Sequence, residues 1–183
     1  MTSSALANLV IRALSAANQG DLNRCDNSFT VEAELCLSAE EGRIDYTVRP
    51  VTPYVKRYGP EVHDAQDYLG RPDRAAWLAY FGGKVAGQIL VHANWNRFAL
   101  IWDIAVDAAY RRMGVGRRLI EQATGWARER ALPGVMLETQ NINVAACKLY
   151  ESCGFALGGF DGCLYRGIEP DTREVALFYY LLF

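Results

Sequence analysis

Histidine is scarce in this chain of 183 residues, which contains only His63 and His92. Neither lies in a metal-ligand spacing, so the sequence does not favour zinc-dependent hydrolysis or Ser–His catalysis. The five cysteines form no Cys-x-x-Cys pair. An odd number of thiols without a secretory signal indicates reduced cysteines in a cytoplasmic protein.

A basic charge excess and a long apolar run are also lacking. The net charge is −2 and the sequence pI is about 5.7, which argues against a general nucleic-acid binder. The apolar run Ala5–Leu14 is interrupted by Arg12, so we expect neither a signal peptide nor a membrane span. With no repeats or low-complexity linkers, residues 1–183 are expected to form one domain.

Hydrophobic patterns predict a mixed α/β (α+β) domain with one central, mostly antiparallel sheet flanked by helices. A modest helix is expected within residues 16–29, and the pattern dissolves from Thr52 to Arg74, which makes this segment a candidate lid. Two better helices are expected from the arginine–glycine loop to about Arg130 and over 143–153. Strands are predicted at 8–15, 30–38, 42–51, 75–81, 85–93, 98–106 and 134–140, and around 157–167 and 175–183.

The stretch AYRRMGVGRRLIEQA, residues 109–123, places two glycines at the expected start of a helix. A helix start offers unpaired N–H groups and positive potential, and glycine lets an anion approach them closely. The stretch therefore predicts a phosphate-binding turn, although a solvated basic surface explains the glycines equally well. It is neither a GxGxxG motif, since Leu119 replaces the third glycine, nor a Walker loop. The buried face of the following helix is expected to carry Val115, Leu119, Ala123, Trp126 and Ala127.

The second informative stretch is NVAACKLYESCGF, residues 143–155. Asn143 is a natural N-cap and Gly154 a natural residue beyond the C-terminus of a helix. Tyr150 lies on the apolar face of this helix, where an ordinary core tyrosine is the simpler interpretation.

Together the two stretches resemble the GNAT superfamily of N-acetyltransferases. Arg111-x-x-Gly114-x-Gly116 has the form of that family's acetyl-coenzyme A loop, and residues 143–155 match its N-x-x-A-x-x-L-Y-x-x-x-G-F signature. A narrower resemblance to streptothricin acetyltransferases extends over most of the chain. It rests on residues 137–165, Trp95–Asn96, PYVKRY at 53–58 and the late ALFYY.

This resemblance implies that acetyl-coenzyme A is the co-substrate, and no metal is expected. A splayed or bulged strand would hold the pantetheine arm and turn a backbone N–H toward the thioester carbonyl. Tyr150 would act as general acid toward the departing thiolate. The expected cofactor-binding residues are Ile104, Ala105, Val106, Arg111, Arg112, Met113, Gly114, Val115, Gly116, Arg117, Asn143 and Ala146.

One position departs from the family pattern. Streptothricin acetyltransferases usually carry a Glu-Asp pair where this chain has Trp102–Asp103, so the usual general base is missing. Strand alternation predicts that Trp102 and Asp103 point to opposite faces. Asp103 is nevertheless the remaining catalytic candidate, through a water relay that could instead use Glu138 or a backbone carbonyl. An unusually acidic amine and a changed or disabled site stay open.

A polycationic acceptor would favour carboxylates and aromatic faces. The expected acceptor-binding residues are Trp102, Glu138, Tyr54, Trp95 and Asp161, with Tyr58 and Glu61 as further candidates. The expected reaction is acetylation of a primary amine on a small cationic acceptor of the streptothricin type. The alternatives are a peptide or protein N-acetyltransferase and a non-catalytic acyl-coenzyme A sensor. No nucleic-acid or membrane partner is expected, and homodimer formation is left open.

Overall fold

The computed structural model describes residues 8–57 and 62–183. Contacts between Cα atoms divide the chain into two compact units. The first unit comprises Met1–Ser28, Arg57–Val135 and Phe183, and the second comprises Phe29–Lys56 and Met136–Leu182. The expectation of one domain over residues 1–183 stays a prediction.

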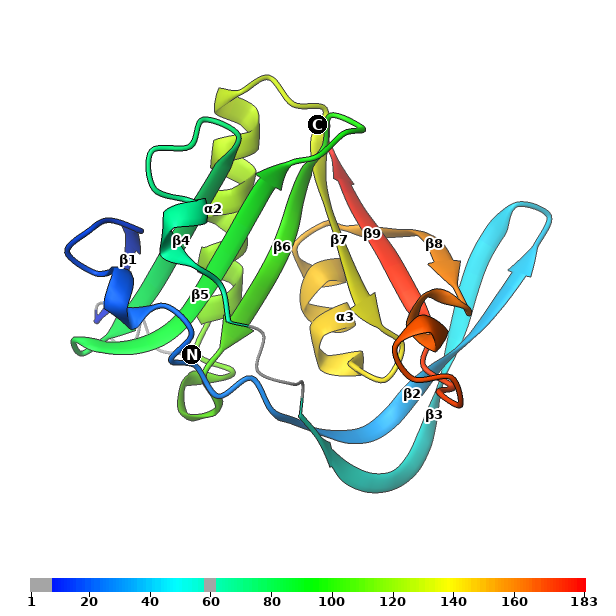
Figure 1. Ribbon diagram of the computed structural model, residues 1–183. Helices are drawn as coiled ribbons and strands as arrows, with labels where there is room; N and C mark the ends of the chain where they lie inside the picture. Colours follow the sequence, from blue (N-terminus) through cyan, green and yellow to red (C-terminus); the bar gives the residue numbers. More distant parts are fainter. Residues whose placement is uncertain (1–7, 58–61) are drawn as a thin grey trace. The chain divides into compact units, whose positions relative to one another are not determined.

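Four antiparallel strands form the sheet of the first unit (Figure 1). Their spatial order is β1 (Leu9–Ala13), β4 (Arg74–Phe81), β5 (Lys84–Ala93) and β6 (Ala99–Val106). All four were predicted, and the pairing of the last three as consecutive antiparallel strands is confirmed.

Helix α2 (Val115–Glu129) covers one face of this sheet, where it packs on β4, β5 and β6. The five residues of the predicted apolar stripe are all buried, which confirms that face of the helix. The opposite face is covered by segments outside the strands, since Leu22 and Tyr68 pack with Leu78 and Leu90 in one buried cluster. The two faces of β5 thus meet different parts of the chain.

The second unit contains a long hairpin of β2 (Phe29–Glu40) and β3 (Arg43–Lys56). Glu41 and Gly42 form its turn, and both have positive φ angles, 48° and 78°. Strand β9 (Ala176–Leu182) lies between β7 (Gly134–Gln140) and β8 (Ala156–Asp161), and β8 and β9 are antiparallel. Helix α3 (Val144–Ser152) contacts β2. The predicted mixed α/β class with mostly antiparallel pairing is confirmed, whereas the splayed strand pair stays a prediction.

Three expectations need correction. The helix expected within residues 16–29 is reduced to the short 3-10 turn Gln19–Asp21, because this polar stretch with Gly20 has no continuous apolar face. The strand expected around 157–167 ends at Asp161 and is followed by the 3-10 turn Leu164–Gly167.

The third correction concerns the segment from Thr52 to Arg74, which is more regular than its pattern suggested. Its first residues continue β3, since pairing with β2 extends to Phe29 and Lys56. Ala65–Asp67 then form a 3-10 turn, capped by the Asp64 carboxylate, which accepts from the Gln66 N–H. Tyr58 and Glu61 lie outside the described residues, and the role of the segment as a lid stays a prediction.

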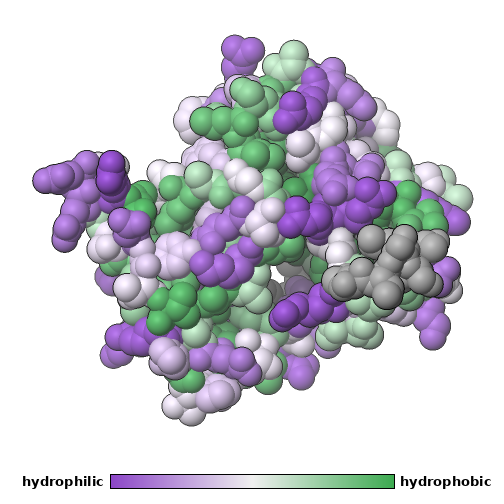
Figure 2. Space-filling model, turned by 180° about the vertical axis from the view of Figure 1, so that it is seen from behind, coloured by the Kyte–Doolittle hydropathy of each residue, from purple (hydrophilic) through white to green (hydrophobic). Residues whose placement is uncertain are grey.

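Surface polarity is mixed. On the face shown in Figure 2, hydrophobic and hydrophilic residues are interspersed. Within residues 8–57 and 62–183, no helix combines the length and apolar character needed to span a membrane.

Candidate active site

The loop between β6 and α2 is fastened to its own unit by Arg111. The guanidinium donates from Nε to the Val106 carbonyl at 3.1 Å and from Nη2 to the Asp26 carbonyl at 3.0 Å. Asp107 reinforces this link, because its carboxylate accepts from the backbone N–H groups of Asp26 and Ala109. Arg111 therefore shapes the predicted cofactor loop by holding its first residues in place.

The helix start beyond this clamp has the features of an anion-binding turn. Gly114 is the N-cap of α2 with φ of 85°, a left-handed conformation that glycine adopts without strain. Arg112 also has a positive φ of 64°. Gly114 has no side chain with which to cap the helix, which is the arrangement expected of a helix start that presents backbone N–H groups to an anion. The predicted helix start is thus formed, and the binding of a pyrophosphate to it stays a prediction.

The side chains of β6 do not follow simple alternation. Pairing with β5 passes from Leu90–Asp103 directly to Val91–Ile101, so Trp102 is the extra residue of a β-bulge. Trp102 stacks on His92, and Asp103 accepts a hydrogen bond from Gln88. Because Gln88 and His92 are four residues apart on β5, they lie on one face of the sheet. Trp102 and Asp103 therefore share that face, and the prediction of opposite faces is wrong because the bulge adds a residue.

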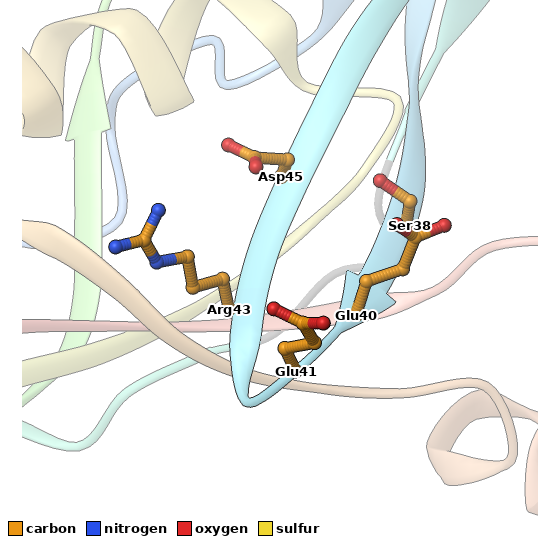
Figure 3. A pocket seen from close by; sticks show the side chains of 5 residues that line it. All are labelled: Ser38, Glu40, Glu41, Arg43 and Asp45. Carbon is orange, nitrogen blue, oxygen red and sulfur yellow. The ribbon is translucent and has the colours of Figure 1, made fainter.

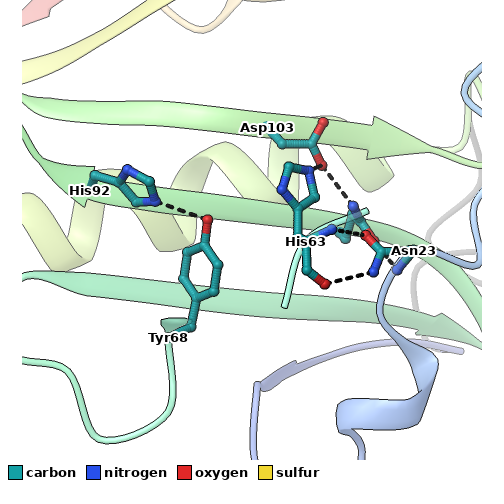
Figure 4. A network of polar contacts seen from close by, with 6 residues as sticks. Asn23, His63, Tyr68, His92 and Asp103 are labelled. Atoms are coloured by element: carbon teal, nitrogen blue, oxygen red, sulfur yellow. Dashed lines mark hydrogen bonds and ion pairs between the residues drawn. The ribbon is translucent and has the colours of Figure 1, made fainter. Parts of the chain in front are cut away.

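Asp103 belongs to a closed ring of polar contacts (Figure 4). Its Oδ2 accepts from Gln88 Nε2 at 2.7 Å and lies 3.6 Å from His63 Nε2. The amide oxygen of Gln88 accepts from the Asn23 N–H at 2.8 Å. Asn23 in turn holds the backbone of His63 at both polar groups: its Oδ1 accepts from the N–H at 3.1 Å, and its Nδ2 donates to the carbonyl at 2.9 Å.

An aromatic stack adjoins this ring. The ring centroids of Trp102 and His92 are 5.0 Å apart and their planes differ by 16°. The hydroxyl of Tyr68 lies 2.8 Å from His92 Nε2 (Figure 4). Burial, followed by the nearby Arg74 charge, lowers the pKa of His92, which keeps its ring neutral at neutral pH. Trp102 itself is 52% exposed, so its outer face is available to a ligand.

In the second unit, Asn143 caps α3 as predicted, accepting from the Ala146 N–H at 3.3 Å. Tyr150 is 5% exposed, and its ring packs against Phe155 and Tyr179. This is the environment of a core tyrosine, and it also holds the phenol in a defined position.

Glu138 lies on β7, where its carboxylate accepts a hydrogen bond from the Tyr165 hydroxyl. Burial raises the pKa of Glu138, and the bond from Tyr165 opposes that rise only in part. Asp161 accepts from the Cys163 N–H at 2.7 Å. Tyr54 on β3 is 46% exposed, and Trp95, on the turn before β6, is 90% exposed.

A polar surface depression lies at the turn of the β2–β3 hairpin and contains none of the predicted site residues. Figure 3 shows the side chains that line it, which are Ser38, Glu40, Glu41, Arg43 and Asp45.

The residues that sequence reasoning missed are those around Asp103 and Trp102. The sequence indicates for His63 only that it lies in no metal-ligand or triad spacing. Asn23 and Tyr68 give no local signal. Gln88 gives the one available hint, because a buried amide within the otherwise apolar run of β5 needs hydrogen-bond partners.

Comparison with known proteins identifies the class. The model of the acetyltransferase (GNAT) family matches residues 43–155, and the chain belongs to that family.

Among its relatives is streptothricin acetyltransferase A of Bacillus subtilis (strain 168), 37% identical over 95% of this chain and 100% of the relative. A streptothricin acetyltransferase of Escherichia coli is 36% identical over 85% of this chain and 86% of its own length. A crystal structure of a candidate streptothricin acetyltransferase of Bacillus anthracis str. Ames, in complex with acetyl coenzyme A, covers 96% of this chain and 97% of its own. Its TM-score is 0.87 at 45% identity.

Proposed function

We propose that this protein transfers the acetyl group of acetyl-coenzyme A to a primary amine of a streptothricin-type antibiotic. The observation that carries the proposal is similarity to streptothricin acetyltransferases along nearly the whole chain, rather than over the cofactor motif alone. The activity would inactivate a cationic antibiotic by converting an ammonium group into a neutral amide.

The loop geometry supports acetyl-coenzyme A as co-substrate. The uncapped start of α2 would bind the pyrophosphate through backbone N–H groups, with Arg112 and Arg117 adding positive charge. The backbone of Ile104, Ala105 and Val106, just beyond the bulge, would pair with the pantetheine arm as an added strand. Asn143 and Ala146 would contribute contacts at the start of α3.

Tyr150 is proposed as the general acid. Free thiols and phenols have pKa values of about 8.5 and about 10, so a phenol keeps its proton at neutral pH and can share it with a departing thiolate. Packing against Phe155 and Tyr179 would fix the direction of the hydroxyl. Trp102 would offer its exposed face to the cationic acceptor, and Glu138, Tyr54, Trp95 and Asp161 stay candidates for the remaining contacts.

The proposal is tested by following thiol release from acetyl-coenzyme A with streptothricin, an aminoglycoside, a polyamine and a lysyl peptide as acceptors. We expect the highest kcat/KM for streptothricin and a product heavier by one acetyl group. If thiol release is greatest with the peptide, the acceptor is a peptide amine and not streptothricin. If no acceptor causes thiol release, the proposed function is wrong.

The cofactor turn is tested separately by calorimetry with acetyl-coenzyme A. Gly116→Val places a branched side chain in the first turn of α2 and should weaken binding at least tenfold. A folded Gly116→Val protein with the same affinity for acetyl-coenzyme A as the parent would contradict the assignment of the pyrophosphate to this turn.

A further inference from the structure

The polar ring around Asp103 holds an imidazole in a fixed place. His63 follows the segment 58–61 in sequence and is anchored through both backbone polar groups to Asn23. Its side chain is only 8% exposed, and that of Asp103 is 22% exposed. The site thus combines a largely buried imidazole with a carboxylate on the bulged strand β6, which is a pairing found where a histidine acts as a general base.

The hydrogen bonds around Gln88 define the role of Asp103. Because the Gln88 amide oxygen accepts from Asn23, its NH₂ group is the part that faces Asp103. Asp103 Oδ2 therefore acts as an acceptor toward Gln88 and lies beside His63 Nε2. The separation of 3.6 Å is within ion-pair range but longer than a hydrogen bond, and such contacts often tighten when substrate binds.

We propose that His63, oriented by Asp103, accepts the proton that the acceptor ammonium must lose before it attacks the thioester. This inference rests on the proposed acetyl transfer. It supplies a general base in place of the glutamate of the family pattern, whose position is occupied here by Trp102. With Nε2–H directed to Asp103, Nδ1 is the proton acceptor, reached directly or across one water. Asp103 is a positioning residue that stabilises the imidazolium.

The step balances as follows. The ammonium gives one proton to His63 Nδ1, and the neutral amine attacks the carbonyl carbon of the thioester. The C–N bond forms and the C–S bond breaks. The general acid gives a proton to the departing sulfur, so coenzyme A leaves as a thiol, and the second nitrogen proton replaces the one that the general acid gave. His63 then returns its proton to solvent.

The charged and titratable groups near His63 come from two strands. Asp103 on β6 lies 3.6 Å from the imidazole, and the charge of His63 contributes to the lowered pKa of His92 on β5. Asn23 and Gln88 are neutral. Within residues 8–57 and 62–183, Asp103 is the carboxylate that lies in ion-pair range of the His63 side chain.

The test compares the parent with His63→Gln at acetyl-coenzyme A saturation. An alkylamine has a pKa of about 10.4, so only about one part in a thousand is neutral near pH 7.4. At that pH, kcat/KM for streptothricin should fall by roughly 10²–10⁴-fold in His63→Gln. The deficit should shrink as the pH rises toward about 10.4, because a growing fraction of the amine is then already neutral. Asp103→Asn should reduce kcat/KM with the same pH trend but less severely.

The affinity for acetyl-coenzyme A and the thermal stability are measured for each variant as well. Both should be retained if His63 acts as a base, whereas loss of either would indicate a structural role. An unchanged pH profile in a folded His63→Gln protein, or an equal deficit at every pH, would overturn the inference. If the parent shows no acetyl transfer at all, the proposed function fails and not this assignment alone.

A second measurement needs no variant at His63. The chain has two histidines, so proton NMR of the parent and of His92→Gln identifies both imidazole titrations. The acid limb of kcat/KM in the parent should coincide with the titration of His63 and persist in His92→Gln. An acid limb that follows neither is evidence against His63 as the base, even if His63→Gln does not fold.

Discussion

The indole of Trp102 lies nearly flat on the imidazole of His92, with ring centroids 5.0 Å apart and an interplanar angle of 16°. The stack exists because the β6 bulge turns Trp102 to the face that carries His92. Because burial lowers the pKa of His92, its imidazole is neutral at neutral pH and places no positive charge behind the indole face that is proposed to meet the cationic acceptor.

Replacing Trp102 with Leu should therefore weaken acceptor binding. A cation–π contact contributes about 0.5–2 kcal/mol, so KM for streptothricin should rise by roughly 2- to 30-fold. Trp102→Phe should show a smaller rise, and KM for acetyl-coenzyme A should change little in both. Steady-state kinetics with each substrate varied provides the measurement. Equal loss in the Phe and Leu variants would assign Trp102 to packing.

Tyr150→Phe keeps the ring packed but removes the proton donor. Turnover should fall by roughly 10²–10⁴-fold while acetyl-coenzyme A affinity is retained. Tyr179→Phe is the matched control in the same aromatic cluster: it loses a 3.3 Å bond to Glu151 and a side-chain contact with Cys147, and it should keep its turnover within about threefold. Parental turnover in Tyr150→Phe, with chemistry rate-limiting, would make Tyr150 a core residue.

Gly87→Ala should disturb the cofactor loop from a distance. A Cβ at this position would lie 2.8 Å from the Ala105 carbonyl and 3.0 Å from Val115 and Leu119 side-chain atoms. Overpacking of this kind destabilises by about 1–3 kcal/mol, and the shift at Ala105 and Val115 should also weaken acetyl-coenzyme A binding.

At Gly125, within α2, an added Cβ would meet no atom within 4 Å apart from its chain neighbours and the backbone of its own helix. It should raise stability by about 0.5–1 kcal/mol. Denaturant titration of both variants measures the change in the free energy of unfolding, which should be a loss for Gly87→Ala and a gain for Gly125→Ala. Calorimetry measures their affinity for acetyl-coenzyme A. A Gly87→Ala protein with parental stability would mean that β5 and α2 pack less closely than described.

Glu151 should make the second unit sensitive to acid. Burial pushes its pKa up, but hydrogen bonds from Tyr46 and Lys148 outweigh this effect, and the net pKa is lowered. A lowered native pKa gives stability that is present above the unfolded value, about 4.3, and is lost as the pH falls through the native value.

Glu151→Gln should therefore melt at a lower temperature than the parent at pH 7, with the difference narrowing below about pH 4. Thermal melts of both proteins across this range provide the comparison. A difference that is constant with pH would indicate lost packing instead of lost charge.

Local features of this fold could be predicted from the sequence because they depend on neighbouring residues. The apolar spacing from Val115 to Ala127 determines which face of α2 is buried, and Asn143 caps α3 through its own side chain. Gly114 lies at the start of α2, where the sequence placed it. Each depends on backbone geometry within a few residues.

The arrangement around Asp103 was decided only by the tertiary structure. The bulge at Trp102 comes from the register of β5 on β6, which alternation within one strand cannot reveal. Asn23 lies 40 residues from His63 and 65 from Gln88, and those bonds form only when separate segments cover the same face of the sheet. A short-range pattern carries no information about contacts at that separation, so the candidate base became visible only in the folded chain.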